Sequence, residues 1–166
     1  MIIRNETNSD LDAITEVTIA AFKTLAVSGH TEHFIINSLR SADALTISLV
    51  VEIDGRVVGH IAFSPVTISD GSKGWYGLGP VSVAPEHQKQ GIGKILINRG
   101  LSMLKESNRK GCVLVGDPGY YKRFGFANIP ELVYEGIPQE FFLVLPFTEN
   151  VSQGNVVFHE GFFADS

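Results

Sequence analysis

The sequence predicts an α/β fold: one domain over residues 1–166, with a mixed central β-sheet flanked by helices. Three observations lead to this prediction. β-rich runs bounded by turn residues alternate with stretches in which apolar residues recur at helical spacing. A helix at 92–106 stands between two apolar strands, which implies a right-handed crossover and parallel pairing. No linker-like stretch divides the 166 residues, an ordinary length for one domain.

The N-terminal part predicts a short strand followed by two helices. Residues 1–5 suit the strand. Apolar residues then recur at helical spacing from Leu11 to Leu25, and three residues before them offer helix caps: Asn8, Ser9 and Asp10. Thr31 is expected to cap the second helix, which ends near Asp43.

A hairpin and a further strand follow. Residues 46–53 and 56–68 are β-rich, and Asp54-Gly55 between them favours a tight turn because both residues tolerate positive φ. The next strand covers 75–84. Three of its residues predict a bulge or bend: Gly77, Gly79 and Pro80.

The C-terminal part begins with a short apolar strand at 111–116. A short helix at 120–124 is expected next, closed by a glycine cap at Gly125. Residues 141–145 and 156–158 suit two more strands.

The stretch Gln88-Lys89-Gln90-Gly91-Ile92-Gly93 joins a strand to the helix at 92–106. The first amides of a helix have no partner within the helix, and the helix dipole makes that end positive. Bare glycine backbone at this point suits a phosphate group. The residues alone leave another reading open, in which the glycines only allow the helix to pack closely on the strand. The stretch is neither a P-loop nor a dinucleotide fingerprint, because the required Lys-Ser/Thr ending and glycine spacing are missing.

This stretch, with Val81-Ser82-Val83-Ala84-Pro85 before it and Tyr121-x-x-x-Gly125-Phe126 after it, resembles the GCN5-related N-acetyltransferase (GNAT) superfamily over roughly residues 2–130. The resemblance implies a turn that holds the pyrophosphate of acetyl-coenzyme A, and splayed parallel strands that form the coenzyme A slot for its pantetheine arm. The implied cofactor-binding residues are Val81, Ser82, Val83, Gln88, Lys89, Gln90, Gly91, Ile92, Gly93 and Lys94.

Tyr121 aligns with the family tyrosine that faces the thioester sulfur. The resemblance therefore implies that its phenol protonates the departing thiolate, with Tyr120 as the alternative. One feature departs from the pattern, because the family asparagine about two helical turns earlier falls here in Val113-Leu114-Val115. Asp117 is a candidate to supply that contact.

The sequence does not identify the general base. The strand at 75–84 has no carboxylate. Glu52, His60 and Glu32 are candidates, but a structural or exposed role is favoured for each, and a water chain could serve instead. Glu32 is the preferred substrate residue, because the first two helices usually frame the acceptor site in this fold.

Composition limits the partners. The net charge of −5 and the pI near 5.5 argue against a general nucleic-acid binder. Cys112 is the only cysteine, so no internal disulfide can form and the sequence contains no cysteine pattern that indicates a metal cluster. The sequence shows neither an apolar run of membrane-spanning length nor a signal-peptide pattern, so a cytoplasmic protein without a membrane partner is expected. The fold resemblance leaves a homodimer open.

The leading hypothesis is an N-acyltransferase that moves an acetyl group from acetyl-CoA directly to an amine acceptor. The alternative from another class is a GNAT-like domain that binds coenzyme A without turnover, as a sensor or interaction module. A purely structural α/β protein is a third and weaker hypothesis.

Overall fold

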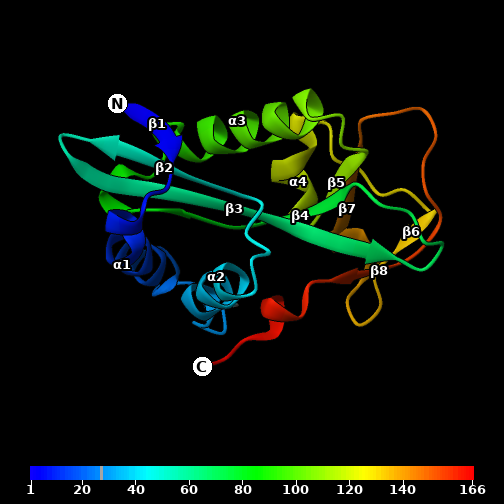
Figure 1. Cartoon of the computed structure of the whole chain (residues 1–166), viewed down its shortest axis with the longest axis horizontal. Helices are drawn as coiled ribbons and strands as arrows, with labels where there is room; N and C mark the ends of the chain where they lie inside the picture. The colour runs from blue at the N-terminus through cyan, green and yellow to red at the C-terminus, as the bar shows by residue number, and fades with distance from the viewer. Residues whose placement is uncertain (27) are drawn as a thin grey trace. The chain divides into compact units, whose positions relative to one another are not determined.

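The computed structural model describes residues 1–26 and 28–166 and contains a mixed β-sheet with flanking helices (Figure 1). Its internal contacts divide the chain into two compact units. The first comprises residues 1–63, 79–100 and 160–166, and the second comprises residues 64–78 and 101–159. Along the sheet the strand order is β1-β2-β3-β4-β5-β7. The mixed sheet is confirmed, whereas the prediction of a single domain stays a prediction.

The first unit contains an antiparallel meander. Strands β1 (Ile2–Asn5), β2 (Ile47–Ile53) and β3 (Arg56–Ile68) pair in that order, with Ile3 opposite Val51 and Val50 opposite His60. Asp54 and Gly55 have φ values of 51° and 77°, so the predicted tight turn between β2 and β3 is confirmed.

The helices of the first unit are η1 (Asn8–Asp10), α1 (Leu11–Phe22), α2 (Glu32–Ser41), η2 (Pro85–His87) and η5 (Glu160–Phe163), with the start of α3 (Ile92–Glu106). Ile14 of α1 and Ile36 of α2 form a buried cluster with Val50 of β2. On the opposite face, a side chain added at Gly59 would meet Ile92 at the start of α3. The sheet of this unit therefore has α1 and α2 on one face and α3 on the other.

The predicted caps of α1 work differently from the expectation. The Asp10 side chain makes no hydrogen bond with the first backbone amides of α1. Its carboxylate instead accepts a hydrogen bond of 2.7 Å from the backbone N–H of Thr7, three residues earlier. Arg4 donates to the same carboxylate at 2.7 and 3.0 Å. The acidic side chain thereby ties the first strand to the start of the helix.

The second unit contains the parallel pair. Strand β4 (Trp75–Val83) pairs in parallel with β5 (Gly111–Val115), from Trp75 opposite Gly111 to Gly77 opposite Val113. The predicted parallel pairing across α3 is therefore confirmed. The slot for a pantetheine arm stays a prediction.

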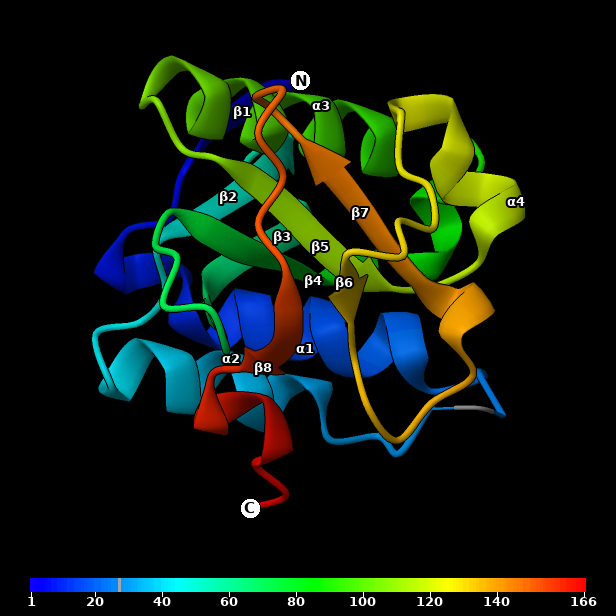
Figure 2. The same ribbon diagram turned by 90° about the vertical axis from the view of Figure 1, so that its right-hand side faces the viewer.

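The remaining strands of the second unit extend this arrangement. Strand β7 (Phe142–Pro146) pairs antiparallel with β5, and Figure 2 shows the two side by side. Strand β8 (Gly154–Phe158) pairs antiparallel with the end of β3 and parallel with β6 (Leu132–Val133). The helices are α4 (Pro118–Tyr121), η3 (Lys122–Phe124) and η4 (Gln139–Phe141). Gly125 has a φ of 97°, which confirms the predicted glycine cap.

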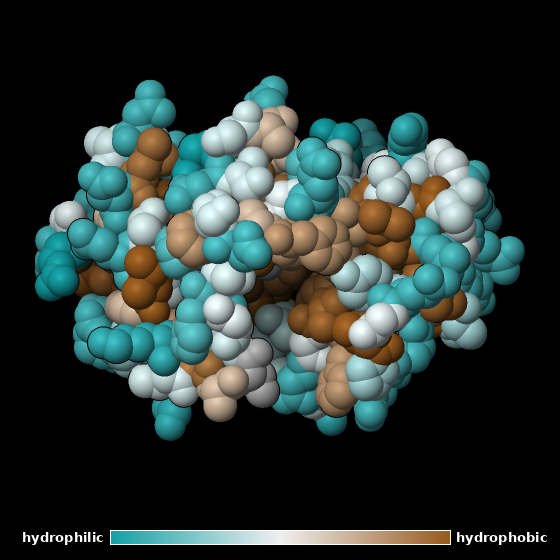
Figure 3. Space-filling view, turned by 90° about the horizontal axis from the view of Figure 1, so that it is seen from below, coloured by the Kyte–Doolittle hydropathy of each residue, from teal (hydrophilic) through white to brown (hydrophobic). Residues whose placement is uncertain are grey.

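No helix in the described part of the chain is long and apolar enough to cross a membrane. Figure 3 shows hydrophobic side chains interspersed among hydrophilic ones on the face that it presents. Four of the exposed large apolar residues are Ile19, Leu25, Val157 and Phe163.

Candidate functional site

The glycine turn connects β4 to α3 within the first unit. Lys89 and Gly91 both have left-handed backbone, with φ values of 63° and 84°. Such a conformation is uncommon for lysine and is well suited to glycine. Apart from the glycine itself and its two chain neighbours, no described residue has an atom within 4 Å of the point where a Cβ of Gly91 would stand. The turn therefore presents open backbone in front of the positive end of α3, where an anion is stabilised.

Gln88 has a structural contact in this turn. Its side-chain amide donates a hydrogen bond of 3.0 Å to the carbonyl oxygen of Val83, the last residue of β4. The contact fixes the path of the chain between the strand and the turn. The sequence predicted Gln88 as a binding residue, and the structure adds that it braces the turn.

The ten predicted cofactor-binding residues all lie in the first unit, on the end of β4, in the turn and in the first turn of α3. They differ in exposure. Ile92 and Ser82 have buried side chains, so Ile92 can offer only its backbone to a ligand at the turn. Five of the residues are exposed: Gln88, Lys89, Gln90, Gly91 and Lys94.

Tyr121 lies in the second unit at the end of α4. The Asp117 carboxylate caps this helix by accepting a 2.9 Å hydrogen bond from the Gly119 N–H. Asp117 is the residue that the sequence suggested in place of the family asparagine, and here it stabilises the start of α4. The Tyr121 ring packs edge-on against Tyr120 at 5.0 Å and against Phe126 at 6.1 Å. Burial raises the pKa of the Tyr121 phenol to about 12, so the hydroxyl keeps its proton at neutral pH.

Gly116 allows Tyr121 to occupy this position. A Cβ at residue 116 would lie 2.6 Å from Cε2 of the Tyr121 ring, so a larger residue would displace the ring. Sequence reasoning missed this role. Its only signal was a glycine at the end of an apolar strand.

Tyr120 makes its contacts with Arg123. The guanidinium of Arg123 stacks over its ring at 4.5 Å, and Arg123 Nε donates to the Tyr120 carbonyl oxygen at 2.8 Å. These contacts fix the alternative phenol in a different environment from that of Tyr121.

The three candidate bases have partners. Arg4 donates to the Glu52 carboxylate at 3.1 Å. The Ser28 hydroxyl lies 2.9 and 2.7 Å from the two carboxylate oxygens of Glu32. His60 is fully buried, and its Nε2 lies 2.8 Å from the hydroxyl of Ser48. The first two contacts hold half-buried carboxylates, whereas the third joins two buried side chains.

Glu32 lines a small pocket between α1 and α2. The pocket encloses about 380 Å³. Its apolar wall comes from Ile19 and Phe22, and its polar lining comes from Lys23, His30, Glu32 and His33. The pocket therefore carries one carboxylate, Glu32, and one ammonium group, Lys23, beside an apolar wall.

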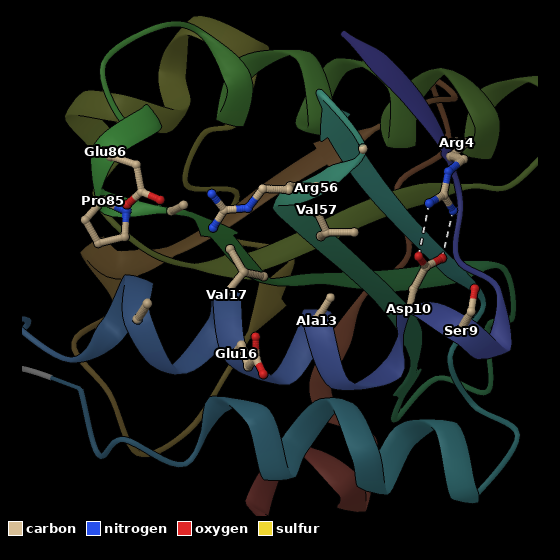
Figure 4. Close-up of a pocket in the computed structure, with 13 residues that line it drawn as sticks. Arg4, Ser9, Asp10, Ala13, Glu16, Val17, Arg56, Val57, Pro85 and Glu86 are labelled. Carbon is tan, nitrogen blue, oxygen red and sulfur yellow. Dashed lines mark hydrogen bonds and ion pairs between the residues drawn. The ribbon is translucent and has the colours of Figure 1, made fainter.

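A larger cleft of about 560 Å³ lies between α1, the β2–β3 turn and residues 84–86, also within the first unit (Figure 4). Arg56 extends over this cleft toward Glu86, while Arg4 at the other end is bound by Asp10. Sequence reasoning did not find this cleft, because its lining comes from four separate segments.

Among residues 1–26 and 28–166, no group of three or more His, Cys, Asp or Glu side chains could hold a metal ion.

The mixed sheet and the open turn before α3 define an α/β protein with exposed backbone at a helix start, an arrangement that suits a phosphate-containing ligand. Residues 12–126 match the model of the acetyltransferase (GNAT) family. The chain therefore belongs to the GNAT family, as the sequence motifs predicted.

Relatives in this family support the assignment. Over 127 residues the chain is 35% identical to the uncharacterised N-acetyltransferase YhbS of Escherichia coli K12, covering 76% of this chain and 73% of YhbS. The crystal structure of YhbS in complex with CoA superposes with a TM-score of 0.89 at 30% identity, covering 99% of this chain and 93% of the other. A GNAT acetyltransferase from Brucella melitensis, in complex with acetyl-CoA, gives 0.87 at 48% identity over 97% of each chain.

Proposed function

We propose that this protein is an acetyl-CoA-dependent N-acetyltransferase that transfers the acetyl group directly to an amine. The observation that carries the proposal is the open turn at Gly91 in front of α3. Backbone amides between Lys89 and Lys94 would bind the pyrophosphate, assisted by the positive end of the helix. The 48%-identical relative with bound acetyl-CoA supports the choice of ligand.

Tyr121 would act on the leaving group. The amine attacks the thioester carbonyl carbon, a C–N bond forms, and the C–S bond breaks with release of a thiolate. A thiolate of ordinary pKa is a weaker base than a phenolate whose conjugate acid has a pKa near 12. The phenol therefore stabilises the developing thiolate mainly by donating a hydrogen bond during bond breaking, an effect within the range of general acids.

The pocket between α1 and α2 would receive the acceptor. Glu32 would bind a cationic group of the acceptor, and Ile19 and Phe22 would contact an apolar arm. This keeps Glu32 as a substrate residue rather than a base.

The test is a transfer assay with acetyl-CoA against a panel of small amines, amino acids and peptides, read by mass spectrometry of the acetylated product. Product with at least one amine supports the proposal. If acetyl-CoA binds by calorimetry but no amine is acetylated, the protein is instead a coenzyme A-binding module. The missing carboxylate on β4 is the observation that favours this second candidate.

A further inference from the structure

The cleft beside α1 has two ends that differ in how their charges are used (Figure 4). At one end Arg4 donates to the Asp10 carboxylate at 2.7 and 3.0 Å and to the Glu52 carboxylate at 3.1 Å. The Asp10 carboxylate also accepts hydrogen bonds from the N–H and the hydroxyl of Thr7, at 2.7 and 3.1 Å. These groups satisfy one another, so this end of the cleft is a wall whose charges are already paired.

At the other end, three charged side chains line the cleft without a partner. Arg56 is the first residue of β3, Glu86 belongs to η2, and Glu16 belongs to α1. None of the three forms a hydrogen bond or an ion pair with another described residue. Figure 4 shows Arg56 and Glu86 reaching toward each other from two sides of the cleft, with Glu16 on α1. This end therefore offers one guanidinium and two carboxylates to a ligand.

The same cleft has an apolar floor. Four more of its lining residues are apolar: Val17, Val57, Ala84 and Pro85. Val17 and Ala84 are buried, and in the view of Figure 4 Val17 lies between Glu16 and Arg56. The volume of about 560 Å³ is within the range of small-molecule sites, which combine apolar walls with a few placed charges. Such a cleft suits a small ligand with charged ends and an aliphatic middle.

The arrangement of the charges defines the class of ligand. The planar fork of the Arg56 guanidinium matches a carboxylate, which it can bind through two parallel hydrogen bonds. An α-amino acid carries an ammonium group on the carbon next to its carboxylate, and Glu86, which faces Arg56, can accept from that group. Glu16 is then left for a second ammonium group at the end of an aliphatic side chain. One carboxylate and two ammonium groups thus balance the one guanidinium and two carboxylates of the cleft.

We infer that this cleft is a binding site for a free basic α-amino acid, of which L-lysine is a simple probe. Arg56 binds the α-carboxylate, Glu86 binds the α-ammonium group, and Glu16 binds the side-chain ammonium group. The site is separate from the glycine turn at 88–93, and no residue lines both this cleft and the pocket between α1 and α2. Binding here requires no acetyl transfer, so it does not depend on the proposed function.

The test is a titration of the full chain with L-lysine, followed by backbone amide NMR of the isotope-labelled protein. Amide signals of residues 13–17, 55–57 and 84–86 should shift. Two analogues each lack one charged group: L-norleucine lacks the side-chain ammonium group, and cadaverine lacks the carboxylate. L-lysine should bind about tenfold more tightly than either analogue, because each analogue loses a charge-assisted contact.

Variants assign each charged group of the ligand to its partner. Arg56→Gln should weaken L-lysine binding about tenfold and leave cadaverine binding unchanged, because cadaverine has no carboxylate to lose. Glu16→Gln should weaken L-lysine binding by a similar factor and leave L-norleucine binding unchanged. Arg99→Gln and Glu106→Gln are the matched controls, since each removes an exposed charge of α3 that does not line the cleft. Both controls should leave all three affinities unchanged.

Equal binding of L-lysine, L-norleucine and cadaverine would overturn the inference. So would an Arg56→Gln variant that weakens L-lysine and cadaverine alike, because that result requires only general charge attraction. Shifts centred on residues 22–23 and 30–33 would place the amino acid in the pocket between α1 and α2 instead, and would equally overturn it. If L-lysine shifts no amide signal at millimolar concentration, the cleft is not a site of this kind.

Discussion

The glycine turn and the hydrogen-bonded chain Arg40–Glu6–Ser48–His60 both lie in the first unit, but they are encoded in opposite ways. The turn is a contiguous run of six residues, 88–93, whose backbone is exposed and open at Gly91. The chain is assembled from four separate segments, and its polar atoms are withdrawn from solvent at the His60 end. A turn made of contiguous backbone can be recognised in sequence, whereas a network of side chains from separate segments requires the fold. Four substitutions test these two regions and the position of Tyr121.

The largest effect is expected from Gly91→Asp. The substitution places a Cβ at a φ of 84° and a negative charge where phosphate would bind. Loss of about two charge-assisted hydrogen bonds at roughly 1.5 kcal/mol each corresponds to about 100-fold weaker acetyl-CoA binding by calorimetry. Gly71→Asp is the matched control, since Gly71 has a φ of 83° and equally open surroundings. Equal affinity in both folded variants would remove the turn from the site.

Tyr121→Phe tests the phenol in the second unit. The change removes one hydroxyl and keeps the ring contacts with Tyr120 and Phe126. We expect kcat to fall about tenfold, at the lower end for general acids, with little change in acetyl-CoA affinity. Tyr120→Phe is the control and should keep the wild-type rate. A slow Tyr120→Phe beside a normal Tyr121→Phe would transfer the role to the neighbour.

Glu6→Gln tests the ionic end of the buried chain through stability. The folded-state pKa of Glu6 is lowered, so the unfolded state takes up the proton first as the pH falls. The stabilisation is thus complete above the unfolded pKa near 4.3 and is lost as the pH falls through the folded value. By urea unfolding, the variant should be less stable than the wild type by about 1–2 kcal/mol at pH 7. The difference should shrink toward pH 3. A constant difference would mean that Glu6 contributes by packing alone.

The smallest effect is expected from Gly116→Ala. The new methyl group would meet the Tyr121 ring and shift it, so kcat should fall about threefold through misplacement of the phenol. The same substitution made in Tyr121→Phe should cause no further loss, because the group that it displaces is already absent. Additive losses would indicate that Gly116 acts on something other than the hydroxyl.

The fold followed closely from the sequence because its signals are local. Asp54-Gly55, the Gly125 cap and the helix at 92–106 each act through neighbouring residues, and each was predicted close to its observed place. Contacts between distant segments did not follow. Nothing in the sequence indicated that the carboxylate of Asp10, directly before α1, would bind Arg4 of β1.

The candidate site likewise combines features that local motifs predict with contacts that only the fold creates. The turn and Tyr121 were predicted from motifs. The partners that position the other polar groups could not be, because Ser48 and His60 meet only when β2 and β3 pair. Gly116 was overlooked for a related reason, since its need for a small side chain comes from a ring five residues later.

The state of Cys112 has a practical consequence. It is the only thiol of the chain, it is fully buried, and burial raises its pKa, so it is protected from thiol-reactive dyes while the protein stays folded. A colorimetric thiol reagent added to a transfer assay would then detect released coenzyme A without a contribution from the thiol of the protein. A cysteine introduced at exposed Gln90 would be the single labelling position in the folded protein, and a fluorophore attached there would test whether a ligand reaches the turn.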